Sequence, residues 1–199
     1  MSQSTIPVLF QAMFKSTAGW NSSDGYASIE LNRSSGNSPP ASGSGNPCHF
    51  VAVFPRDDPG KGAVYQQVCN SSTDVPAGLD QYLDDQHILF WASAAFVTQM
   101  PQGNLYTMLD ANGGGSKLRQ MEMLATAFAC GVNSGMVYLM ASVPGTGMNG
   151  IELLKIRESS TGGPASGGTQ VYSAQVLHFM LLLELIPSST GLYTPVELH

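Results

Sequence analysis

Three glycines after an apolar run are the first candidate site in this chain. Gly145, Gly147 and Gly150 stand in the order G-x-G-x-x-G directly after a run that ends at Val143. Between a strand and a helix, such glycines let a dinucleotide pyrophosphate approach the helix N-terminus. Here residues 151–156 are apolar at four of six positions and favour a strand, and no carboxylate stands about 20 residues further on to bind a ribose. We therefore interpret the three glycines as a turn between two strands.

A second glycine run resembles a phosphate-binding loop. Gly113, Gly114 and Gly115 precede Ser116 and Lys117, but the first glycine of such a loop is missing at the required spacing, and the run follows a polar turn instead of a strand. Lys117 is then not aimed at a phosphate. We predict a flexible linker that leads into a helix capped by Ser116.

Two pairs of carboxylates are candidates for acid–base chemistry or for a calcium site. Asp57-Asp58 and Asp84-Asp85 lie in polar turns, and the EF-hand spacing of acidic residues with glycine is absent. We interpret both pairs as solvated connections and assign no catalytic residue to them.

Three histidines lie within apolar runs or at their edges: His49, His87 and His178. Catalytic triads are assembled by the fold, so spacing alone does not reveal them, but the nucleophile-elbow pattern G-x-S-x-G is absent. We expect these histidines to be satisfied core or strand-edge residues. A hydrolase that uses His87 or His178 with a nearby carboxylate is kept as a third hypothesis.

The chain has three cysteines, so at least one is unpaired. Either all three are free thiols, or Cys48 and Cys69 form one bridge, with Cys130 as a small buried side chain of a helix. No cysteine or histidine stands at a zinc-finger spacing. We predict no metal and no cofactor.

Composition limits the classes of partner. Charged residues make up 11% of 199 residues, the net charge is −6, and the eight lysines and arginines are scattered. Neither a nucleic acid nor an anionic membrane surface would find a basic patch here. A surface of uncharged polar groups is common in extracellular β-rich domains and in virion or fibre proteins. We expect an extracellular or virion-associated protein, although the chain as given begins without a signal peptide.

Apolar periodicity predicts more strands than helices. Strands are expected over 6–14, 26–31, 49–54, 63–69, 88–97, 136–143, 151–156 and 171–186, the last containing a buried strand and no transmembrane segment. Helices are expected near Leu79, Tyr82 and Leu83 after N-cap residues 72–74, around 105–109, and from Leu118 to a glycine cap at Gly131. Residues 34–47 are predicted to be a flexible surface loop. The fold class is α+β: a compact mixed or antiparallel β-sheet sandwich with two or three packed helices, in one domain over 1–199.

Aromatic residues are the best candidates for ligand contact. Trp91 lies in a doubly apolar run and is expected in the core, whereas Trp20 lies in a polar turn where its ring can stack on a sugar. Trp20, Asn21, Asp24 and Tyr26 are therefore the predicted ligand-binding residues.

The order of segments carries a family resemblance. The segments are DGYASI at 24–29, the strands 49–54 and 63–69, LDQYL at 79–83, the strand 88–96, the helix 118–130 and MVYLMASVPG at 136–145. Over about residues 20–155 this order resembles the interleukin-like EMT inducer (ILEI) family, with a C-terminal strand extension over 156–199. The resemblance implies an ILEI-like fold and a role in recognition. Known roles in that family are cytokine-like signalling and, in the stem of a protein O-mannose N-acetylglucosaminyltransferase, sugar binding.

Two functional hypotheses follow, beside the hydrolase. The first is a non-catalytic recognition module that binds a glycan or a protein surface. The second is a structural or assembly subunit, such as a phage-tail, fibre or virion-associated protein, because low charge and many apolar strands suit chains that self-associate. Neither hypothesis includes an enzymatic activity.

Overall fold

The computed structural model describes residues 4–16, 23–33, 36–37, 41–127, 134–157 and 175–198. The strands are β1 (Ile6–Ser16), β2 (Ser23–Arg33), β3 (Gly36–Asn37), β4 (Ala41–Gly45), β5 (Cys48–Pro55), β6 (Tyr65–Cys69), β7 (His87–Phe96), β8 (Gly135–Ser142), β9 (Ile151–Arg157), β10 (Gln175–Pro187) and β11 (Tyr193–Glu197). The helices are α1 (Gly103–Ala111) and α2 (Ser116–Ala127), with 3-10 turns η1 (Pro59–Lys61), η2 (Leu79–Tyr82) and η3 (Val97–Gln99).

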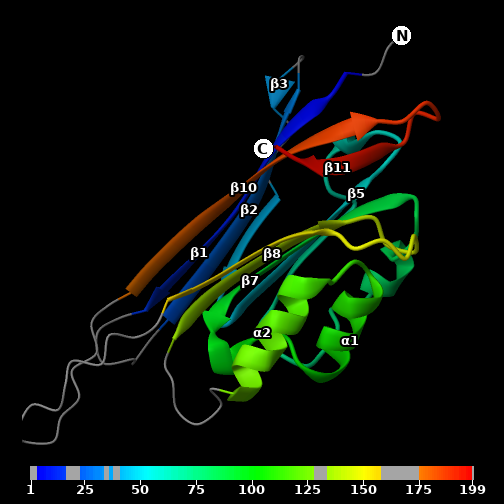
Figure 1. The fold of residues 1–199 in the computed structure, drawn as a ribbon. Coiled ribbons are helices and arrows are strands. Elements are labelled where there is room, and N and C mark those ends of the chain that lie inside the picture. The colour runs from blue at the N-terminus through cyan, green and yellow to red at the C-terminus, as the bar shows by residue number, and fades with distance from the viewer. Residues whose placement is uncertain are drawn as a thin grey trace, which may run out of the picture.

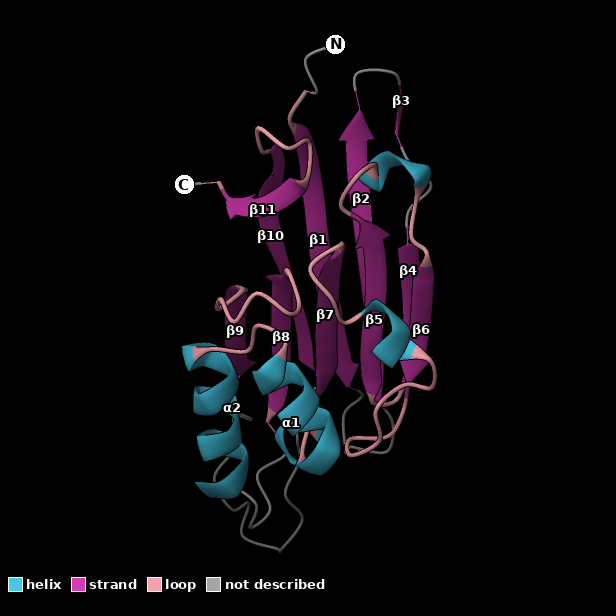
Figure 2. Ribbon diagram, turned by 90° about the vertical axis from the view of Figure 1, so that its right-hand side faces the viewer, coloured by secondary structure: helices cyan, strands magenta, loops and turns pink. Residues whose placement is uncertain are grey.

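The strands form two sheets, and every pairing between described strands is antiparallel. The outer sheet has the order β11-β10-β1-β2, with β3 and β4 both paired to β2, and the middle sheet has the order β6-β5-β7-β8-β9. The two sheets pack face to face, and α1 and α2 cover the other face of the middle sheet (Figures 1 and 2). The predicted α+β sandwich with packed helices is confirmed, and of the mixed and antiparallel alternatives the antiparallel one holds.

Both faces of the middle sheet are covered at its central strands β5, β7 and β8, which explains why these strands are apolar at most positions. On β7, Phe90 packs toward the outer sheet, where its ring meets Phe10 edge to face at 5.4 Å between ring centroids. Leu89 and Trp91 point the other way, into the core beneath the helices. Trp91 is fully buried, as predicted.

The two ends of the chain share the outer sheet. β1 pairs with β10 over its whole length, from Ile6 opposite Leu185 to Ser16 opposite Gln175, and β2 pairs on its other side. The elements of the middle sheet and both helices come between these strands in the sequence. Residues nearly the full chain length apart therefore build one sheet.

The prediction of a flexible loop over 34–47 is wrong for β4, which pairs with β2. A Cβ atom built on Gly43 would lie 2.2 Å from Val68 and 2.9 Å from Phe50, where no side chain fits. Glycine and serine are present in this segment because an edge strand passes close to a second sheet, although the same composition is typical of flexible loops.

The predicted helix near Leu79 is only the 3-10 turn η2. Gly78 precedes it in the left-handed conformation at φ 79°, so residues 72–74 do not start a helix there. Leu79 is buried and Tyr82 and Leu83 pack beside it, as the predicted apolar stripe requires. The side chain of Ser72 instead donates a hydrogen bond to the carbonyl of Gln99 at 2.7 Å.

The glycine run before α2 is a packed junction, so the predicted flexible linker is wrong. Gly113, Gly114 and Gly115 are all buried. A Cβ on Gly113 would lie 2.3 Å from the Cβ of Ser142, and its φ of 116° also favours glycine. These glycines let the helices approach the end of β8.

The N-terminus of α2 is capped by a residue of β9, and the predicted cap by Ser116 is replaced. Oε1 of Glu152 accepts hydrogen bonds from the N–H of Leu118 at 2.9 Å and the hydroxyl of Tyr138 at 2.7 Å, and Oε2 accepts one from the N–H of Lys117 at 3.1 Å. A carboxylate at this position also complements the helix dipole. Burial and this carboxylate raise the pKa of Tyr138 well above its usual value. The predicted glycine cap at Gly131 lies outside the described residues.

Cys48 and Cys69 are both free, so the predicted alternative of a Cys48–Cys69 bridge is wrong. Cys48 belongs to the core between the two sheets, whereas Cys69 pairs across the strands with His49 and shares the opposite face of the middle sheet. Burial raises the pKa of the Cys48 thiol to about 12. Cys130 lies outside the described residues.

Candidate functional site

The structure describes two of the four predicted ligand-binding residues. Asp24 and Tyr26 are exposed residues of β2 at positions that point away from the middle sheet. Tyr26 lies across from Met13 of β1. Trp20 and Asn21 lie outside the described residues. The two described residues belong to the face of the outer sheet that points away from the middle sheet, which we call the outer face.

The outer face is formed by alternate residues of β1, β2, β4, β10 and β11, and no described element packs on it (Figure 1). Its members are Pro7, Leu9, Gln11, Met13, Lys15, Asp24, Tyr26, Ser28, Glu30, Asn32, Ser42, Ser44, Val176, His178, Met180, Leu182, Glu184, Ile186, Val196 and Leu198. A solvated face of an antiparallel sheet ordinarily carries polar side chains. Here many of the positions are apolar.

The exposed apolar side chains of the outer face are large. Their exposed fractions are 57% for Met180, 54% for Leu182, 50% for Val176, 45% for Leu198, 42% for Val196, 39% for Ile186 and 37% for Tyr26. The sequence predicts a buried strand over 176–186, and this is only half right. Leu177, Leu181, Leu183 and Leu185 are buried, but the alternate residues of β10 are not.

Strand register collects these side chains into rows. Leu9 of β1 lies across from Leu182 of β10, and the N–H of Leu198 bonds to the carbonyl of Leu182 at 3.2 Å. A shallow hollow of about 280 Å³ opens along this row, with Glu30 also on its wall. The outer face thus has a continuous apolar strip and a carboxylate beside it.

A polar ladder crosses the middle of the outer face. Nε2 of His178 donates a hydrogen bond to Oε1 of Gln11 at 2.9 Å, and Nε2 of Gln11 donates one to Oγ of Ser28 at 3.0 Å. The ladder joins β10, β1 and β2 through side chains. It holds the middle of the face in one arrangement.

Charges on the outer face are separated by end. Lys15 and Asp24 lie across from each other at one end of β1 and β2. Glu184 lies across from Pro7 at the opposite end of β1, and Glu30 lies across from Leu9. One end of the face therefore has a cation, and the other has only carboxylates among the members named above.

His49 forms the most buried polar network, and it has no accessible surface. Its Nε2 donates to the carbonyl of Gln99 at 3.0 Å, so its Nδ1 accepts from the hydroxyl of Ser93 at 2.9 Å. Oγ of Ser93 in turn accepts from the indole N–H of Trp91 at 2.9 Å. Burial lowers the pKa of His49 to about 4, against the opposing effect of the bond to Gln99. Every polar atom of this Ser-His pair is committed to the fold, which confirms His49 as a satisfied core residue.

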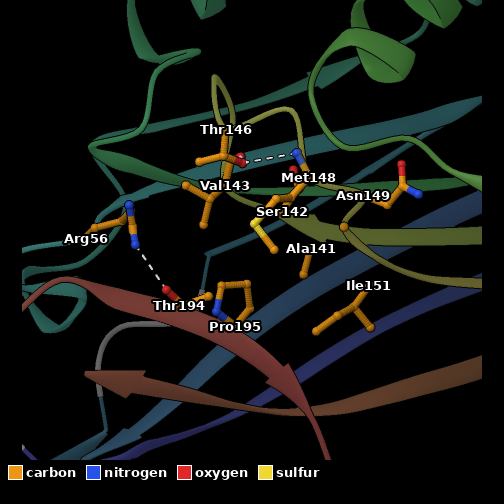
Figure 3. A pocket seen from close by; sticks show the side chains of 11 residues that line it. Arg56, Ala141, Ser142, Val143, Thr146, Met148, Asn149, Ile151, Thr194 and Pro195 are labelled. Atoms are coloured by element: carbon orange, nitrogen blue, oxygen red, sulfur yellow. Dashed lines mark hydrogen bonds between the residues drawn. The ribbon is translucent and has the colours of Figure 1, made fainter. Parts of the chain in front are cut away.

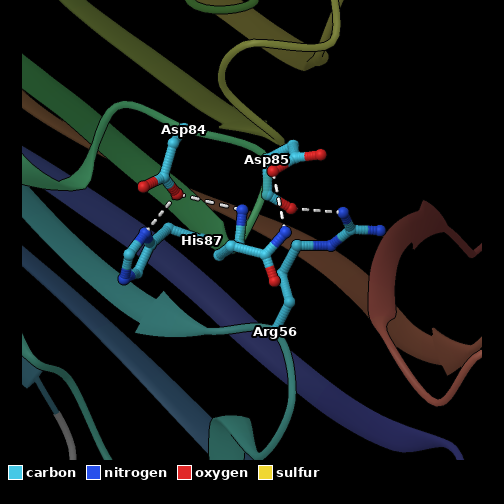
Figure 4. Close-up of polar contacts among 5 residues, drawn as sticks. Arg56, Asp84, Asp85 and His87 are labelled. Carbon is cyan, nitrogen blue, oxygen red and sulfur yellow. Dashed lines mark hydrogen bonds and ion pairs between the residues drawn. The ribbon is translucent and has the colours of Figure 1, made fainter.

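His87 is the histidine that meets a carboxylate, as Figure 4 shows. Its Nδ1 lies 2.6 Å from Oδ1 of Asp84, the same oxygen that accepts the N–H of Gln86 at 2.9 Å. Tyr82 packs edge to face on the imidazole. Within the described ranges, no serine, threonine or cysteine is hydrogen-bonded to this imidazole. The pair closes the turn before β7, and the hydrolase hypothesis gains no nucleophile from it.

The glycine loop after Val143 is a turn between two strands, as predicted. Gly145 and Gly147 have positive φ of 73° and 67°, and β9 begins at Ile151. The loop lines a small pocket of about 130 Å³ together with Arg56 and β11 (Figure 3). No described helix follows the loop, so its N–H groups are not arranged as in a dinucleotide site.

Arg56 beside this pocket links three segments. Its Nε donates to the carbonyl of Tyr193 at 2.7 Å, its Nη2 to Oγ1 of Thr194 at 3.0 Å, and its Nη1 to the carbonyl of Asp85 at 2.5 Å (Figures 3 and 4). The guanidinium therefore joins β11 to the end of β5 and to the turn before β7. We interpret Arg56 as a structural clamp.

The Asp57-Asp58 pair is solvated, as predicted. Asp57 and Asp58 lie 3.8 and 3.9 Å from the ammonium of Lys61 on an exposed turn. Within the described part of the chain, no three histidine, cysteine, aspartate or glutamate side chains gather to hold a metal ion. Neither α1 nor α2 has the length and apolarity needed to cross a membrane.

The outer face is therefore the strongest candidate site. Asp24 and Tyr26, two of the residues that the sequence predicts to bind a ligand, lie on it. The sequence did not reveal the contribution of β10 and β11, since alternate exposure in an apolar run leaves no trace in composition. Comparisons of the chain with models of protein families, with curated protein sequences and with solved structures gave no match.

Proposed function

We propose that this protein is a non-catalytic recognition module that binds a protein surface through the outer face. The observation that carries the proposal is the set of large apolar side chains exposed there, with Met180, Leu182 and Val176 at least half exposed. Contiguous exposed apolar area on a folded chain is typical of interaction sites. The resemblance to the ILEI family supports the same role, because recognition is what that family is known for.

The chemistry of the outer face favours a protein over a glycan. Apart from Tyr26, its large exposed apolar side chains are methionine or aliphatic, and such side chains adapt to other apolar side chains. Tyr26 is the one aromatic side chain among its described members, and Asp24 is its nearest carboxylate on β2. A sugar needs a flat ring with several hydrogen-bonding groups around it. Glycan binding at the outer face would therefore depend on Tyr26 and Asp24 alone. A glycan array that compares the wild type with Tyr26→Ala tests this alternative.

The exposed methionines provide a built-in test of the protein-binding proposal. Peroxide oxidises methionine at a rate that follows its exposure, and Met180 on the outer face is 57% exposed, against 71% for Met123 in α2 and 71% for Met148 in the loop after β8. We expect peroxide to oxidise Met180 several-fold more slowly when the protein is in its native cells or particles than when it is purified and dilute. Met123 and Met148 should differ much less between the two conditions.

Mass spectrometry of the three methionine peptides measures these rates. Equal oxidation of Met180 in both conditions, with Met123 and Met148 as internal references, would contradict binding at the outer face. The expected extracellular or virion-associated location is tested by fractionation of the same samples.

A further inference from the structure

The outer face has the dimensions of a standard protein interface. Its two central strands β1 and β2 have 11 residues each. The outer strands β4 and β11 have five residues each and β10 has 13. At about 3.4 Å per residue and about 4.8 Å between strands, the five strands together cover about 700 Å². Each partner in a standard-size complex buries about 800 Å². One partner of similar size can cover the whole face.

The pattern of side chains is self-complementary about one axis. The row of Gln11 and Met180 lies midway along the outward positions of β1, which run from Pro7 to Lys15. A two-fold axis that runs across the strands along this row turns each strand end for end. It places Met180 of one copy against Met180 of the second. Lys15 of each copy then lies against Pro7 of the other, with Glu184 of that other copy beside it.

The same axis also matches the polar groups of β2. The outward positions of β2 run from Asp24 at one end to Asn32 at the other. End-for-end reversal places Asp24 against Asn32, and Tyr26 against Glu30, so that an amide and a phenol meet the two carboxylates. These pairs can form hydrogen bonds at the edge of an apolar contact.

A two-fold axis along the strands gives a poorer match of charges. It would lay β10 over β2 and place Leu182 on Glu30 and Val176 on Asp24, which buries carboxylates against apolar side chains. It would also place Lys15 against Lys15. The axis across the strands lays one carboxylate of each copy, Glu184, over an apolar side chain, Val176, whereas the axis along the strands does this with two and also opposes Lys15 to Lys15. The charge pattern of the outer face therefore favours the axis across the strands.

Building on the recognition function proposed above, we propose that the partner is a second copy of this chain. The two outer sheets pack face to face about 10 Å apart, as in an aligned β-sandwich, around the axis across the strands. Met180, Leu182 and Leu9 form the apolar centre. Lys15 and Glu184 form an intermolecular pair at each end.

Sedimentation velocity of the purified full chain, from low micromolar to several hundred micromolar, tests the dimer. We expect a concentration-dependent dimer in wild type. Met180→Lys places an ammonium group on the axis and should raise the dissociation constant by about 100-fold or more. Met123→Lys and Met148→Lys alter methionines that are more exposed but off the outer face, and they should leave the dissociation constant unchanged.

Charge reversal tests the axis. Lys15→Glu should raise the dissociation constant by about tenfold because it puts a carboxylate beside Glu184 of the second copy. Lys15→Glu combined with Glu184→Lys restores the opposite-charge pair and should return the dissociation constant toward the wild-type value. With the axis along the strands, Lys15 faces Lys15 and no rescue occurs. Circular dichroism and urea unfolding of each variant confirm that the fold is retained.

Several results would overturn the proposal. A wild type that stays monomeric over the whole concentration range contradicts the second copy, and a dimer that is insensitive to Met180→Lys contradicts the outer face as its interface. If Met180 is protected in the native assembly while the pure chain is monomeric, the recognition function stands with a different protein on the face. If Met180 is unprotected and the chain is monomeric, both proposals fail.

Discussion

His49 is a buried imidazole whose two nitrogens have partners of opposite kind. The carbonyl of Gln99 accepts only, so it requires a proton on Nε2, and Ser93 then donates to the bare Nδ1. A second proton on Nδ1 would oppose the hydroxyl of Ser93 and place a charge where no water reaches. The neutral ring is therefore part of the folded state.

Acid should destabilise the fold through His49. Its pKa falls from 6.5 to about 4 on folding, so the stability that the neutral ring contributes is complete above pH 6.5 and is lost as the pH falls toward 4. The expected loss is about 3 kcal/mol of unfolding free energy over that range. Urea unfolding at pH 7 and pH 4.5 measures it.

His49→Asn is the matched control for this prediction. The amide oxygen can accept from Ser93 but takes up no proton in this pH range, while the carboxylates titrate as in wild type. The variant should have a lower unfolding free energy at neutral pH and a flatter dependence on pH. An equal decline in both proteins would contradict the assignment to His49.

At the scale of elements, α2 starts on a carboxylate from another strand. Glu152→Gln keeps the shape of the side chain, removes its charge, and leaves only one oxygen for the three donors Lys117 N–H, Leu118 N–H and Tyr138 hydroxyl. We expect a loss of about 1 to 3 kcal/mol of unfolding free energy. Thermal unfolding measures it, with Glu197→Gln as an exposed control that should change the free energy by less than about 0.5 kcal/mol. Similar stabilities of the two variants would show that Glu152 is not the cap.

β4 depends on the absence of a side chain at one position. Gly43→Ala puts a methyl group within 2.2 Å of Val68, so β4 must move or its partners must shift. We expect a loss of about 1 to 3 kcal/mol, as in other overpacked cores. Ser42→Ala, on the opposite and exposed face of β4, should change the unfolding free energy by less than about 0.5 kcal/mol. Chemical denaturation compares them, and a neutral Gly43→Ala would contradict the tight contact between β4 and the middle sheet.

At the scale of the whole molecule, three layers leave one sheet face uncovered. The middle sheet lies between the outer sheet on one side and α1 and α2 on the other, so its central strands β5, β7 and β8 are buried on both faces (Figure 2). Among the residues that the structure describes, the outer sheet is covered on its inner side alone. The described layers thus leave the apolar residues of the outer face exposed, and this is why we propose recognition at that face.

The strands of the middle sheet could be predicted from the sequence, because a strand covered on both faces is a continuous apolar run. His87–Phe96 and Gly135–Ser142 are such runs, and the glycine turn after Val143 follows from the apolar β-like segment that comes next. The burial of Trp91 follows from the same local signal. Hydrophobic periodicity and turn residues are local properties, and they determine the type of each element.

Only the tertiary structure decided which elements meet. It paired β1 with β10, placed Glu152 at the start of α2, separated Cys48 from Cys69 by a sheet, and made a strand of the glycines and serines around Gly43. It also decided the candidate site, since an apolar strand has the same composition whether its second face is covered or open. Burial and long-range pairing depend on the whole arrangement of layers, whereas the sequence by itself specifies which side chains each strand and helix carries.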